Sequence, residues 1–385
     1  MQKRLGIFHM LPSGGGIRVA TQFAEGLSSA FSVKVYRPEG GVSFRSSHPV
    51  SEQTFLFPMW KRPSGLLKPV SPLFLILRLY SFRRLCKTIA ESMNTQADIA
   101  LVHNSLPIAS PPVLNYLNIP SLYYCYEYPR HIYESDIIRR SGNRFTEFLL
   151  KPLAIAEKEM DRSSVAEADS IATFSTYMKN RIQSIYSRNA SIIRPGVDTS
   201  FFFPVPSTNR ENYILSVGAL WPFKGHEKTL RILAAIKNKP KLVITADRAY
   251  PGYKKHLEAI SSDAGIQLAI EEGVTDSRLR DLYRQAKLVI CCQKREPYGL
   301  VPLEAMACGT PVLAVAEGGF PDNIEHNKTG FLFDGTVSHG AHILKMILNN
   351  RELAEAAGSA GREFVMKERC LSSGINQLAR EIDRL

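Results

Sequence analysis

Length, composition and charge set the first limits on what this chain can be. Its 385 residues exceed the roughly 250–300 residues at which a single hydrophobic core stops growing, so two domains are expected. A composition of 44% hydrophobic and 22% charged residues excludes a largely disordered chain. The formal net charge of +12 favours an anionic partner, which leaves nucleic acid, an anionic membrane surface or a phosphorylated substrate.

Short apolar runs alternate with helix-like segments through the first half of the chain. Residues 17–29, 144–168 and 176–186 are predicted to be helical. The runs predicted to be short buried strands are residues 5–10, 32–36, 99–103, 122–126, 170–174 and 191–194.

The second half repeats this alternation more clearly. Its predicted strands are residues 213–217, 241–245, 267–270, 287–291 and 310–315. The helices between them are predicted near residues 225–237, 252–263, 276–286 and 299–308. Strands that alternate with helices indicate parallel sheets, so the predicted fold class is α/β with two doubly wound, Rossmann-like domains.

A polar segment with two prolines, residues 203–211, is the best candidate for a linker. The predicted division is an N-terminal domain of residues 1–196 and a C-terminal domain of residues 197–365. A last helix, residues 366–385, is expected to return to the first domain. Ligands of doubly wound sheets bind beyond the carboxyl ends of the strands, so we expect the site in a cleft where the two domains face each other.

Cysteine usage and the N-terminus limit the cell compartment. None of the six cysteines forms a C-x2-C pair, so reduced, buried thiols are expected rather than a metal site or a disulfide framework. The N-terminus reads as a first strand and not as a signal peptide. There is no run of 18 apolar residues to span a bilayer. We therefore expect a cytoplasmic protein, peripheral at most at the inner face of the membrane.

Two glutamates, Glu296 and Glu304, flank the start of a predicted helix directly after a buried strand. Between them, the segment from Tyr298 to Val301 places backbone N–H groups at the helix N-terminus, where anions and hydroxyl oxygens bind well. Gly299 allows a ligand to approach the backbone closely. A carboxylate at Glu304 can accept hydrogen bonds from a vicinal diol such as ribose. By itself, such a pair is more typical of a solvated helix start.

The surrounding sequence changes this interpretation. The segment from Glu296 to Ala314 closely resembles the E-x7-E signature of glycosyltransferase family 4, whose members have the GT-B fold. Four further segments, residues 216–226, 272–283, 317–322 and 328–333, resemble motifs of the same family in the same order. Residues 194–202 resemble its crossing segment between the domains. The resemblance covers roughly residues 190–335, and several motifs in register make it specific.

The resemblance implies a retaining transfer of a sugar from a nucleotide-diphosphate donor to an acceptor hydroxyl. Glu304 would bind the ribose and Glu296 the donor sugar, while the Lys224 ammonium would stabilise the leaving diphosphate. The backbone of Val274 would contact the base, with UDP- or GDP-sugars the expected donors. Contacts to sugar and phosphate would come from the backbone of Tyr298, Gly299, Leu300 and Val301. With Lys224 and the helix N-terminus on the diphosphate, no metal and no cofactor are expected.

One position departs from the family pattern. Ala219 stands where the family usually carries an arginine beside the lysine. Arg248 and Arg18 are candidates to replace it, although each is more typical of a solvated surface charge. The Gly-rich loop after the first strand is not a dinucleotide fingerprint, because the acidic residue expected about 20 positions later is absent. The resemblance implies that this loop, with Gly15 and Gly16, closes over the donor diphosphate.

The resemblance implies that the N-terminal domain is the acceptor side and that the C-terminal domain binds the nucleotide sugar, but the N-terminal domain fits the family less closely. Family members often carry a histidine beside the donor sugar at the end of a strand, where this chain has Tyr126. His103 ends the neighbouring predicted strand and is the alternative, although a lone histidine there is more often structural. We take His103 and Tyr126 as catalytic candidates together with Glu296 and Lys224. Glu127 and Arg130 are candidates for the acceptor side.

A basic and aromatic stretch lies in the first domain. Between residues 53 and 90 there are seven basic residues and no acid. Within residues 60–87 they are interleaved with aromatic and aliphatic side chains, which fits docking on an anionic membrane surface beside a lipid-linked or envelope glycan acceptor. A solvated basic face over a core helix is an equal alternative. Nucleic acid is not an expected partner, because no RNA- or DNA-binding module is recognised.

Three functions remain open at this stage. A glycosyltransferase is favoured, because the Lys-Gly loop and the E-x7-E segment indicate transfer. A nucleotide-sugar 2-epimerase of the same fold would need acid and base groups around the sugar but no acceptor. A catalytically inactive nucleotide-sugar-binding subunit would be consistent with the changes at Ala219 and Tyr126.

Overall fold

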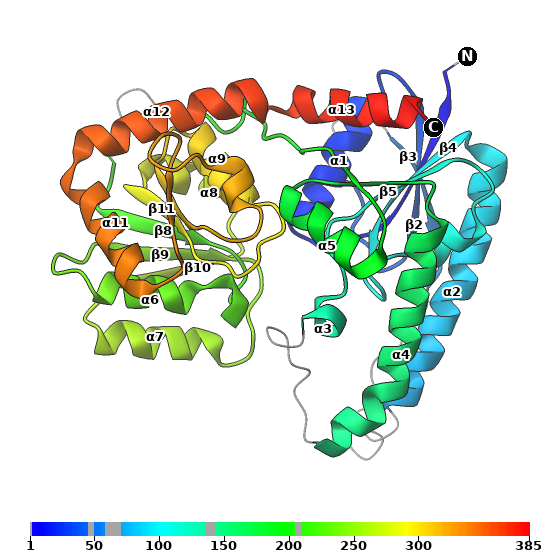
Figure 1. The fold of residues 1–385 in the computed structure, drawn as a ribbon, viewed down its shortest axis with the longest axis horizontal. Coiled ribbons are helices and arrows are strands. Elements are labelled where there is room, and N and C mark those ends of the chain that lie inside the picture. Colours follow the sequence, from blue (N-terminus) through cyan, green and yellow to red (C-terminus); the bar gives the residue numbers. More distant parts are fainter. Residues whose placement is uncertain (1, 45–49, 58–70, 135–143, 205–209) are drawn as a thin grey trace. The chain divides into compact units, whose positions relative to one another are not determined.

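The chain forms two compact units, each built around one parallel sheet (Figure 1). The computed structural model describes residues 2–44, 50–57, 71–134, 144–204 and 210–385. Unit 1 comprises Met1–Phe174, Met178–Arg194 and Ile375–Leu385. Unit 2 comprises Ser175–Tyr177 and Pro195–Gly374. The predicted α/β class with two sheets is confirmed.

Unit 1 contains a seven-stranded sheet in the order β3-β2-β1-β4-β5-β6-β7, and all its strand pairs are parallel. The six strands predicted in this half are present. Strand β3, which the sequence analysis missed, is a polar edge strand with only partly buried side chains. The strands are β1 (Arg4–Met10), β2 (Ser32–Pro38), β3 (Ser51–Phe55), β4 (Ile99–Ser105), β5 (Ser121–Tyr124), β6 (Ser170–Thr173) and β7 (Ser191–Ile192).

The helices of unit 1 bury apolar side chains against this sheet and against one another. They are α1 (Gly15–Leu27), α2 (Ser71–Gln96), the 3-10 turn η2 (Pro112–Tyr116), α3 (Arg130–Tyr133), α4 (Arg144–Glu167) and α5 (Thr176–Tyr186). The sequence analysis did not assign α2 as a helix. Its apolar residues occupy both the core-facing side, with Leu79, Phe82 and Met93 buried, and the exposed side, so the helical period is weak.

Unit 2 contains a six-stranded parallel sheet in the order β10-β9-β8-β11-β12-β13. The order reverses between β8 and β11, and such a reversal creates the crevice in which doubly wound sheets bind ligands. The five predicted strands are present and β13 is additional. The strands are β8 (Tyr213–Val217), β9 (Lys241–Ala246), β10 (Leu268–Glu272), β11 (Leu288–Cys291), β12 (Val312–Val315) and β13 (Phe331–Phe333).

The helices of unit 2 follow its strands in sequence, and the four predicted between residues 225 and 308 are present. The element between β8 and the first full helix is a single 3-10 turn, η3 (Pro222–Lys224). The helices are α6 (His226–Ala234), α7 (Tyr253–Asp263), α8 (Asp276–Gln285), α9 (Leu300–Ala307), α10 (Phe320–Asn323), α11 (Val337–Asn349), α12 (Arg351–Glu368) and α13 (Leu371–Asp383), which ends in unit 1.

The chain passes from unit 1 to unit 2 two residues before the boundary expected after residue 196, and not within the linker candidate of residues 203–211. The change after the first half falls between Arg194 and Pro195, so residues 203–211 belong to unit 2; residues 205–209 lie outside the described ranges. Arg210 explains this placement, because its guanidinium donates to the carbonyls of Arg284 and Gly309. From Ile375 onward the chain belongs to unit 1, where Ser191 donates to Glu381 at 2.6 Å.

The cysteines and the helices bear on two further expectations. All six cysteine thiols are unpaired; five are buried and Cys370 is partly exposed. Burial raises the pKa of the Cys292 thiol to about 11 and that of Cys125 to about 12, so both are protonated at neutral pH. Among the described helices, none is long and apolar enough to cross a bilayer.

Two histidines are fully buried in the core of unit 1. His9 in β1 and His103 in β4 are both 0% exposed. Burial lowers the pKa of His103 to about 3. The pKa of His9 is also held well below its ordinary value, first by burial and then by the nearby His103 and Arg37. Neither imidazole can therefore be charged in the folded unit near neutral pH.

These histidines predict that unit 1 is sensitive to acid. Unfolding restores an ordinary pKa near 6.5, so the unfolded chain binds more protons as the pH falls from about 6.5 towards about 3. The contribution of these neutral histidines to the free energy of unfolding is therefore fully present above about pH 6.5. Below that pH it decreases by at most about 1.4 kcal/mol per pH unit for each histidine. Hydrogen exchange of β1 and β4 peptides between pH 7 and pH 5 measures this loss.

A matched pair of variants isolates the buried imidazole. His103→Phe should make the pH dependence of exchange in β1 and β4 shallower, because one titrating group is removed. His342→Gln, at an exposed position of α11, should leave it unchanged. An equally steep dependence in His103→Phe would contradict the assignment of the acid sensitivity to His103.

Candidate functional site

The loop between β8 and α6 is fixed by a close backbone contact. Gly225 has a φ of +78°, and a Cβ at this position would lie only 2.1 Å from the Cys292 carbonyl oxygen. Glycine is therefore required, since any side chain would collide with backbone. This contact brings the β8 loop against the segment that follows β11. Lys224, which precedes Gly225, is thereby placed next to that segment.

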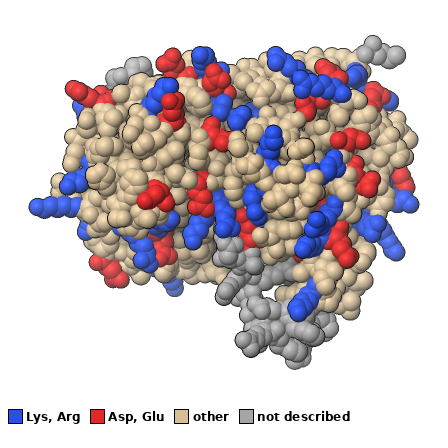
Figure 2. Space-filling model, viewed as in Figure 1, with Lys and Arg blue, Asp and Glu red and all other residues tan. Residues whose placement is uncertain are grey.

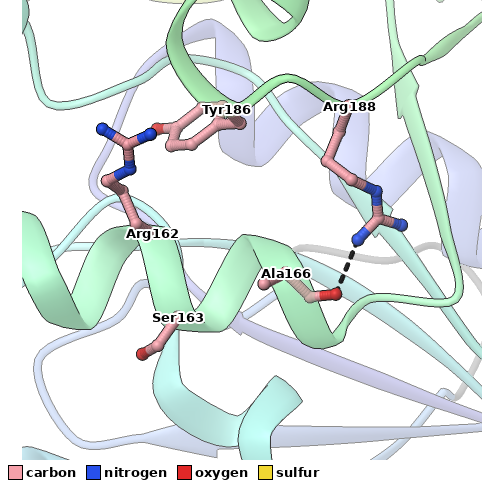
Figure 3. A pocket seen from close by; sticks show the side chains of 5 residues that line it. All are labelled: Arg162, Ser163, Ala166, Tyr186 and Arg188. Atoms are coloured by element: carbon pink, nitrogen blue, oxygen red, sulfur yellow. Dashed lines mark hydrogen bonds between the residues drawn. The ribbon is translucent and has the colours of Figure 1, made fainter.

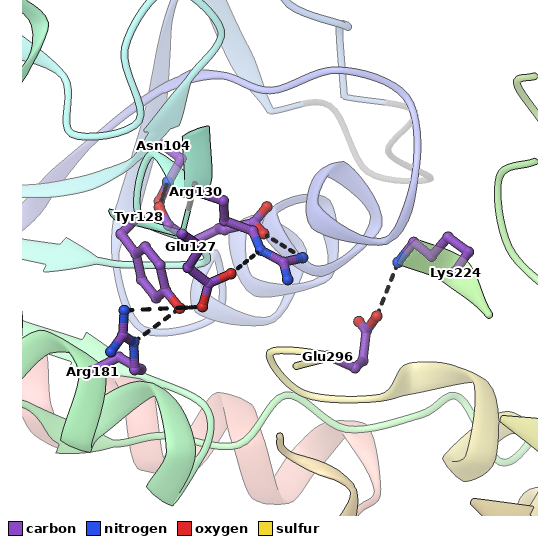
Figure 4. A network of polar contacts seen from close by, with 8 residues as sticks. Asn104, Glu127, Tyr128, Arg130, Arg181, Lys224 and Glu296 are labelled. Atoms are coloured by element: carbon purple, nitrogen blue, oxygen red, sulfur yellow. Dashed lines mark hydrogen bonds and ion pairs between the residues drawn. The ribbon is translucent and has the colours of Figure 1, made fainter. Parts of the chain in front are cut away.

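Lys224 and Glu296 form an ion pair in this position. The Lys224 Nζ lies 2.9 Å from the Glu296 Oε2, and both side chains remain partly exposed, at 26% and 21% (Figure 4). The two residues predicted to contact the donor diphosphate and the donor sugar therefore lie side by side, 72 positions apart in sequence. A partly exposed pair of opposite charges can exchange its mutual contact for a ligand that carries both phosphate and hydroxyl groups.

The backbone around Glu296 is held in an uncommon conformation. Arg295 has a φ of +48°, which non-glycine residues adopt rarely, and functional sites often contain such residues. The Glu296 carbonyl accepts a hydrogen bond from the Gly319 amide at 2.7 Å. A Cβ at Gly318 would lie 2.4 Å from the same carbonyl oxygen. The glycines of the segment after β12 thus allow it to pack against Glu296 and fix its backbone.

Glu304 is buried inside the first turns of α9 and is oriented by Tyr283. It is 4% exposed, and the Tyr283 hydroxyl donates to its Oε2 at 2.8 Å. Gly299 precedes the helix with a φ of +92°, and a Cβ there would collide with the Phe320 ring. The backbone N–H groups from Leu300 onward form the helix N-terminus between the two glutamates.

The predicted base contact belongs to the same edge of the sheet. Val274 follows β10, and Thr275 then caps α8 by accepting a hydrogen bond from the Arg278 amide. Strands β8, β10 and β11 are parallel members of one sheet, so their carboxyl ends share one edge. The structure therefore brings Lys224, Val274, Glu296 and Glu304 to a single edge of unit 2.

Two residues that sequence reasoning missed support this edge. His226 is buried, contacts the Ser216 hydroxyl at 2.9 Å, and its Nε2 lies 3.1 Å from the Gly218 carbonyl oxygen. Burial lowers its pKa to about 4, so it is neutral and fixes the loop that carries Lys224. The other residue is Tyr283. Its position two turns into α8 gave no sequence signal, whereas His226 follows the Lys-Gly pair directly.

In unit 1 the predicted residues lie at the carboxyl ends of β1, β4 and β5. Gly15 and Gly16 form the first turn of α1, and Gly14 before it has a φ of +131°. A Cβ at Gly16 would make only an ordinary contact, 3.8 Å from Tyr126 and Leu11. The surrounding protein atoms therefore leave room for a Cβ at position 16 and do not by themselves require glycine there.

His103 and Tyr126 are neighbours in a buried polar cluster. Their ring centroids lie 5.4 Å apart. The described residues supply no hydrogen-bond partner for either nitrogen of His103, for the Tyr126 hydroxyl or for the Nε2 of His9. Asn104, a residue that sequence reasoning missed, accepts from the Tyr126 amide at 2.9 Å and donates to the Glu127 carbonyl at 2.6 Å. It ties the ends of β4 and β5 together.

Arg130 is part of an internal ion pair rather than an open acceptor contact. It is 7% exposed, and its Nε donates to the buried Glu134 at 2.7 Å. The Tyr128 hydroxyl also donates a hydrogen bond to Glu134, and the Arg181 Nε donates one to the Tyr128 hydroxyl at 3.0 Å (Figure 4). Glu127 has a 45% exposed side chain and lies 3.4 Å from Arg130. Of the two acceptor-side candidates, Glu127 is the one exposed to solvent.

The two candidate replacements for the missing arginine can also be located. Arg248 follows β9 and pairs with Asp247 at 3.3 Å, with a side chain that is 55% exposed. Arg18 lies in the first half of α1 in unit 1. Arg248 thus shares the ligand edge of the unit 2 sheet, and its role towards a diphosphate stays a prediction.

A pocket of about 420 Å³ in unit 1 lies away from these residues (Figure 3). It is lined by Arg162, Ser163, Ala166, Tyr186 and Arg188. Helices α4 and α5 run toward the amino ends of β6 and β7, which is the sheet edge opposite to Gly15 and His103. Arg188 donates to the carbonyls that end α4, so its guanidinium caps this helix.

Comparisons with known proteins agree with this geometry. A family described as "Glycosyltransferase Family 4" matches residues 13–201, and one described as "Glycosyl transferases group 1" matches residues 198–364. The chain is 31% identical over 227 residues to a GDP-mannose-dependent alpha-(1-6)-phosphatidylinositol monomannoside mannosyltransferase of Mycobacterium tuberculosis. That alignment covers 52% of this chain and 58% of the relative, so the chain spans little more than half of its length.

A second relative is a D-inositol 3-phosphate glycosyltransferase of Acidothermus cellulolyticus, 29% identical over 218 residues, with 48% of this chain and 49% of that protein covered. Among solved structures, sucrose-phosphate synthase from Thermosynechococcus elongatus matches with a TM-score of 0.77 at 17% identity, over 100% of this chain and 99% of the other. Anabaena Alr3699/HepE in complex with UDP matches with a TM-score of 0.76 at 16% identity, over 99% and 100%.

These structural matches establish the fold, and the two family matches together span residues 13–364. The E-x7-E segment and the lysine of the β8 loop lie where the sequence resemblance predicted them. The chain belongs to glycosyltransferase family 4 and has the GT-B fold of two Rossmann-like domains.

Proposed function

We propose that this chain is a retaining glycosyltransferase that moves a sugar from a UDP- or GDP-sugar to an acceptor hydroxyl. The observation that carries the proposal is the Lys224–Glu296 pair at 2.9 Å, beside the N-terminus of α9. At one sheet edge, the Lys224 ammonium and the backbone N–H groups of α9 can bind the diphosphate of such a donor, and the Glu296 carboxylate can bind the hydroxyl groups of its sugar. The relatives, whose names specify GDP-mannose and inositol phosphate chemistry, support the same class of reaction.

In this mechanism the donor diphosphate replaces the Glu296 carboxylate as partner of Lys224. The ammonium and the helix N-terminus then stabilise the charge that develops on the leaving nucleotide, so the reaction needs neither a metal ion nor a cofactor. Glu296 turns to the donor sugar and balances positive charge at the anomeric carbon. A phosphate oxygen of the donor accepts the proton of the acceptor hydroxyl on the same face, which retains the anomeric configuration.

Glu304 acts on the nucleotide side. Tyr283 holds one of its carboxylate oxygens at 2.8 Å, which orients the group toward the ribose diol. For unit 1, the family resemblance implies that Gly15 and Gly16 contact the diphosphate and that His103 or Tyr126 contacts the donor sugar. Measuring nucleotide release with a panel of UDP-, GDP- and ADP-sugars tests the whole assignment; tight donor binding without any turnover would favour a binding subunit.

The two glutamates should separate kinetically. Glu296→Gln removes the charge that faces the sugar, so kcat should fall by about 10²-fold while nucleotide affinity changes little. Glu304→Ala removes charged hydrogen bonds to the ribose, so the Kd of UDP or GDP should rise about 10- to 100-fold. Calorimetric titration of the nucleotide and steady-state nucleotide release with saturating donor measure the two effects.

Glu325→Gln is the matched control for charge removal, because Glu325 lies in the same unit and pairs with Lys328 at 2.9 Å with a side chain that is 63% exposed. It should leave kcat and nucleotide affinity unchanged. Full activity of Glu296→Gln would show that its assigned role is wrong. A thermal unfolding midpoint close to that of the parent chain confirms that each variant is folded.

We also propose that unit 1 docks on an anionic membrane surface through α2, beside a lipid-linked or envelope glycan acceptor. Residues 60–70 of the expected stretch lie outside the described ranges. Along α2 an exposed stripe follows the helical period, with Leu73, Leu77 and Tyr80 at 61%, 51% and 49% exposure. The exposed basic residues Arg83, Arg84 and Lys87 continue it.

Such an arrangement suits a membrane interface, because apolar side chains enter the headgroup region while basic ones bind anionic lipids. On the face of the molecule drawn in Figure 2, by contrast, Lys and Arg side chains are interspersed with Asp and Glu. The docking proposal does not rest on the overall charge of +12. It rests on the local combination of exposed apolar and basic residues along α2.

Liposome flotation tests this docking surface. The chain should float with vesicles containing anionic lipid, less so at high salt, and not with neutral vesicles. Replacing Arg83, Arg84 and Lys87 by Gln should weaken binding by about 100-fold, since each basic residue contributes about 1 kcal/mol.

Leu77→Ser should also weaken flotation, whereas Ile155→Ser should not, because Ile155 is equally exposed at 58% but lies on α4. Binding to anionic vesicles that is absent or indifferent to salt would refute the docking proposal without affecting the proposed transfer reaction.

A further inference from the structure

An exposed aromatic cluster lies on the two loops that follow β8 and β9 in unit 2. Trp221 is 37% exposed and Tyr250 is 42% exposed, and their ring centroids lie 5.3 Å apart. The Phe223 ring lies 6.0 Å from Trp221. Large apolar side chains gathered at the surface, rather than scattered singly, typically mark a binding site. Sequence reasoning assigned no role to any of these three residues.

The cluster is held rigidly by the backbone beneath it. The Leu220 amide donates to the Arg248 carbonyl at 2.7 Å, and the Tyr250 amide donates to the Leu220 carbonyl at 2.9 Å. The Leu220 side chain is fully buried and anchors both loops. The Lys224 amide closes the turn onto the Trp221 carbonyl at 2.9 Å. A surface fixed in this way loses little conformational entropy when a ligand binds.

The cluster adjoins the candidate donor residues. Trp221 lies three residues before Lys224, whose ammonium sits 5.8 Å above the Phe223 ring. Strand β8 lies between β9, which leads to Tyr250, and β11, which leads to Glu296. The aromatic cluster therefore shares the ligand edge of the sheet with Lys224 but is separated by one strand from the carboxylate proposed to hold the donor sugar.

The chemistry around the rings favours a carbohydrate. A pyranose presents C–H groups on its face and hydroxyl groups around its rim, so it stacks on an amphipathic aromatic surface and hydrogen-bonds with its edge. Asp247 and Arg248, in the same loop as Tyr250, have side chains that are 45% and 55% exposed. A carboxylate and a guanidinium beside aromatic faces supply an acceptor and a donor for such hydroxyls.

We propose that Trp221 and Tyr250 form a platform for a pyranose ring of the acceptor. Because their ring planes are inclined at 58°, the pyranose stacks on one ring and contacts the other with its edge. The proposal rests on the glycosyltransferase function proposed above, which assigns the donor sugar to Glu296 and leaves the acceptor glycan as the other sugar in the reaction. Phe203, another exposed aromatic residue of unit 2, lacks an open ring face. It is also exposed, at 40%, but the guanidinium of Arg284 covers its ring at 4.0 Å, so its face is occupied.

Trp221 can report on its own occupancy. The chain has two tryptophans, so Trp60→Phe, at a position outside the described residues, leaves Trp221 as the sole indole. The full chain carrying this substitution is saturated with UDP or GDP and titrated with methyl α-glycosides of glucose, mannose, galactose and N-acetylglucosamine. We expect a saturable shift of the indole emission with at least one glycoside, and saturation transfer from protein to that glycoside in NMR.

Variants identify the platform. Trp221→Ala and, independently, Tyr250→Ala should each weaken glycoside binding by about tenfold or more, as expected for the loss of a central aromatic contact. Neither should change the Kd of UDP or GDP or the slow release of nucleotide from the donor without acceptor. Met366→Ala, at a 51% exposed position of α12, is the matched control and should change none of these quantities.

Two results would overturn the proposal. One is the absence of any glycoside response across the panel in the folded, nucleotide-saturated chain. The other is a saturable indole response to UDP or GDP alone, together with a higher nucleotide Kd in Trp221→Ala. This pair of results would identify the cluster as a nucleobase platform. Donor turnover without acceptor is measured separately, so failure of the proposed donor site would be seen independently of the platform.

Discussion

The candidate site depends on the close approach of two backbone segments at Gly225. No side chain fits there, because a Cβ would lie 2.1 Å from the Cys292 carbonyl oxygen. This contact packs the loop after β8 against the loop after β11, at the point where the strand order of the sheet reverses. It is what places the Lys224 ammonium 2.9 Å from the Glu296 carboxylate. The neutral, buried His226 fixes the same loop, because its Nε2 lies 3.1 Å from the Gly218 carbonyl oxygen.

Charges and helix ends on this edge complement one another. Lys224 and the N-terminus of α9 are the positive elements, and Glu296 and Glu304 are the negative ones. In the structure Glu296 forms an ion pair with Lys224, and Glu304 accepts a hydrogen bond from the neutral Tyr283 hydroxyl. A nucleotide sugar carries anionic phosphates and hydroxyl-rich rings, so it can take over both sets of contacts without leaving a buried charge unpaired. The edge is therefore suited to the nucleotide-sugar donor proposed above.

Unit 1 offers a different chemistry at the ends of its strands. Among the described residues there, His9, His103 and Tyr126 have buried side-chain polar atoms without a hydrogen-bond partner, and burial holds both imidazoles neutral. Neutral rings can donate to and accept from hydroxyl groups but cannot stabilise a phosphate by charge. Arg130, which follows β5, is paired with the buried Glu134.

The sequence by itself predicted the fold class and most of the strands, because apolar periodicity is a local property of the chain. The donor-side roles of Glu296 and Glu304 came from the family resemblance and stay predictions. Helix α2 was not assigned, because its exposed leucines weaken the helical period. The crossing between the units falls between Arg194 and Pro195, two residues before the boundary expected after residue 196. Sequence reasoning also missed Asn104, Tyr283 and His226, whose partners are 22, 21 and 10 positions away. Only tertiary structure decided these roles, because hydrogen bonds and exposed aromatic faces arise when distant segments pack together.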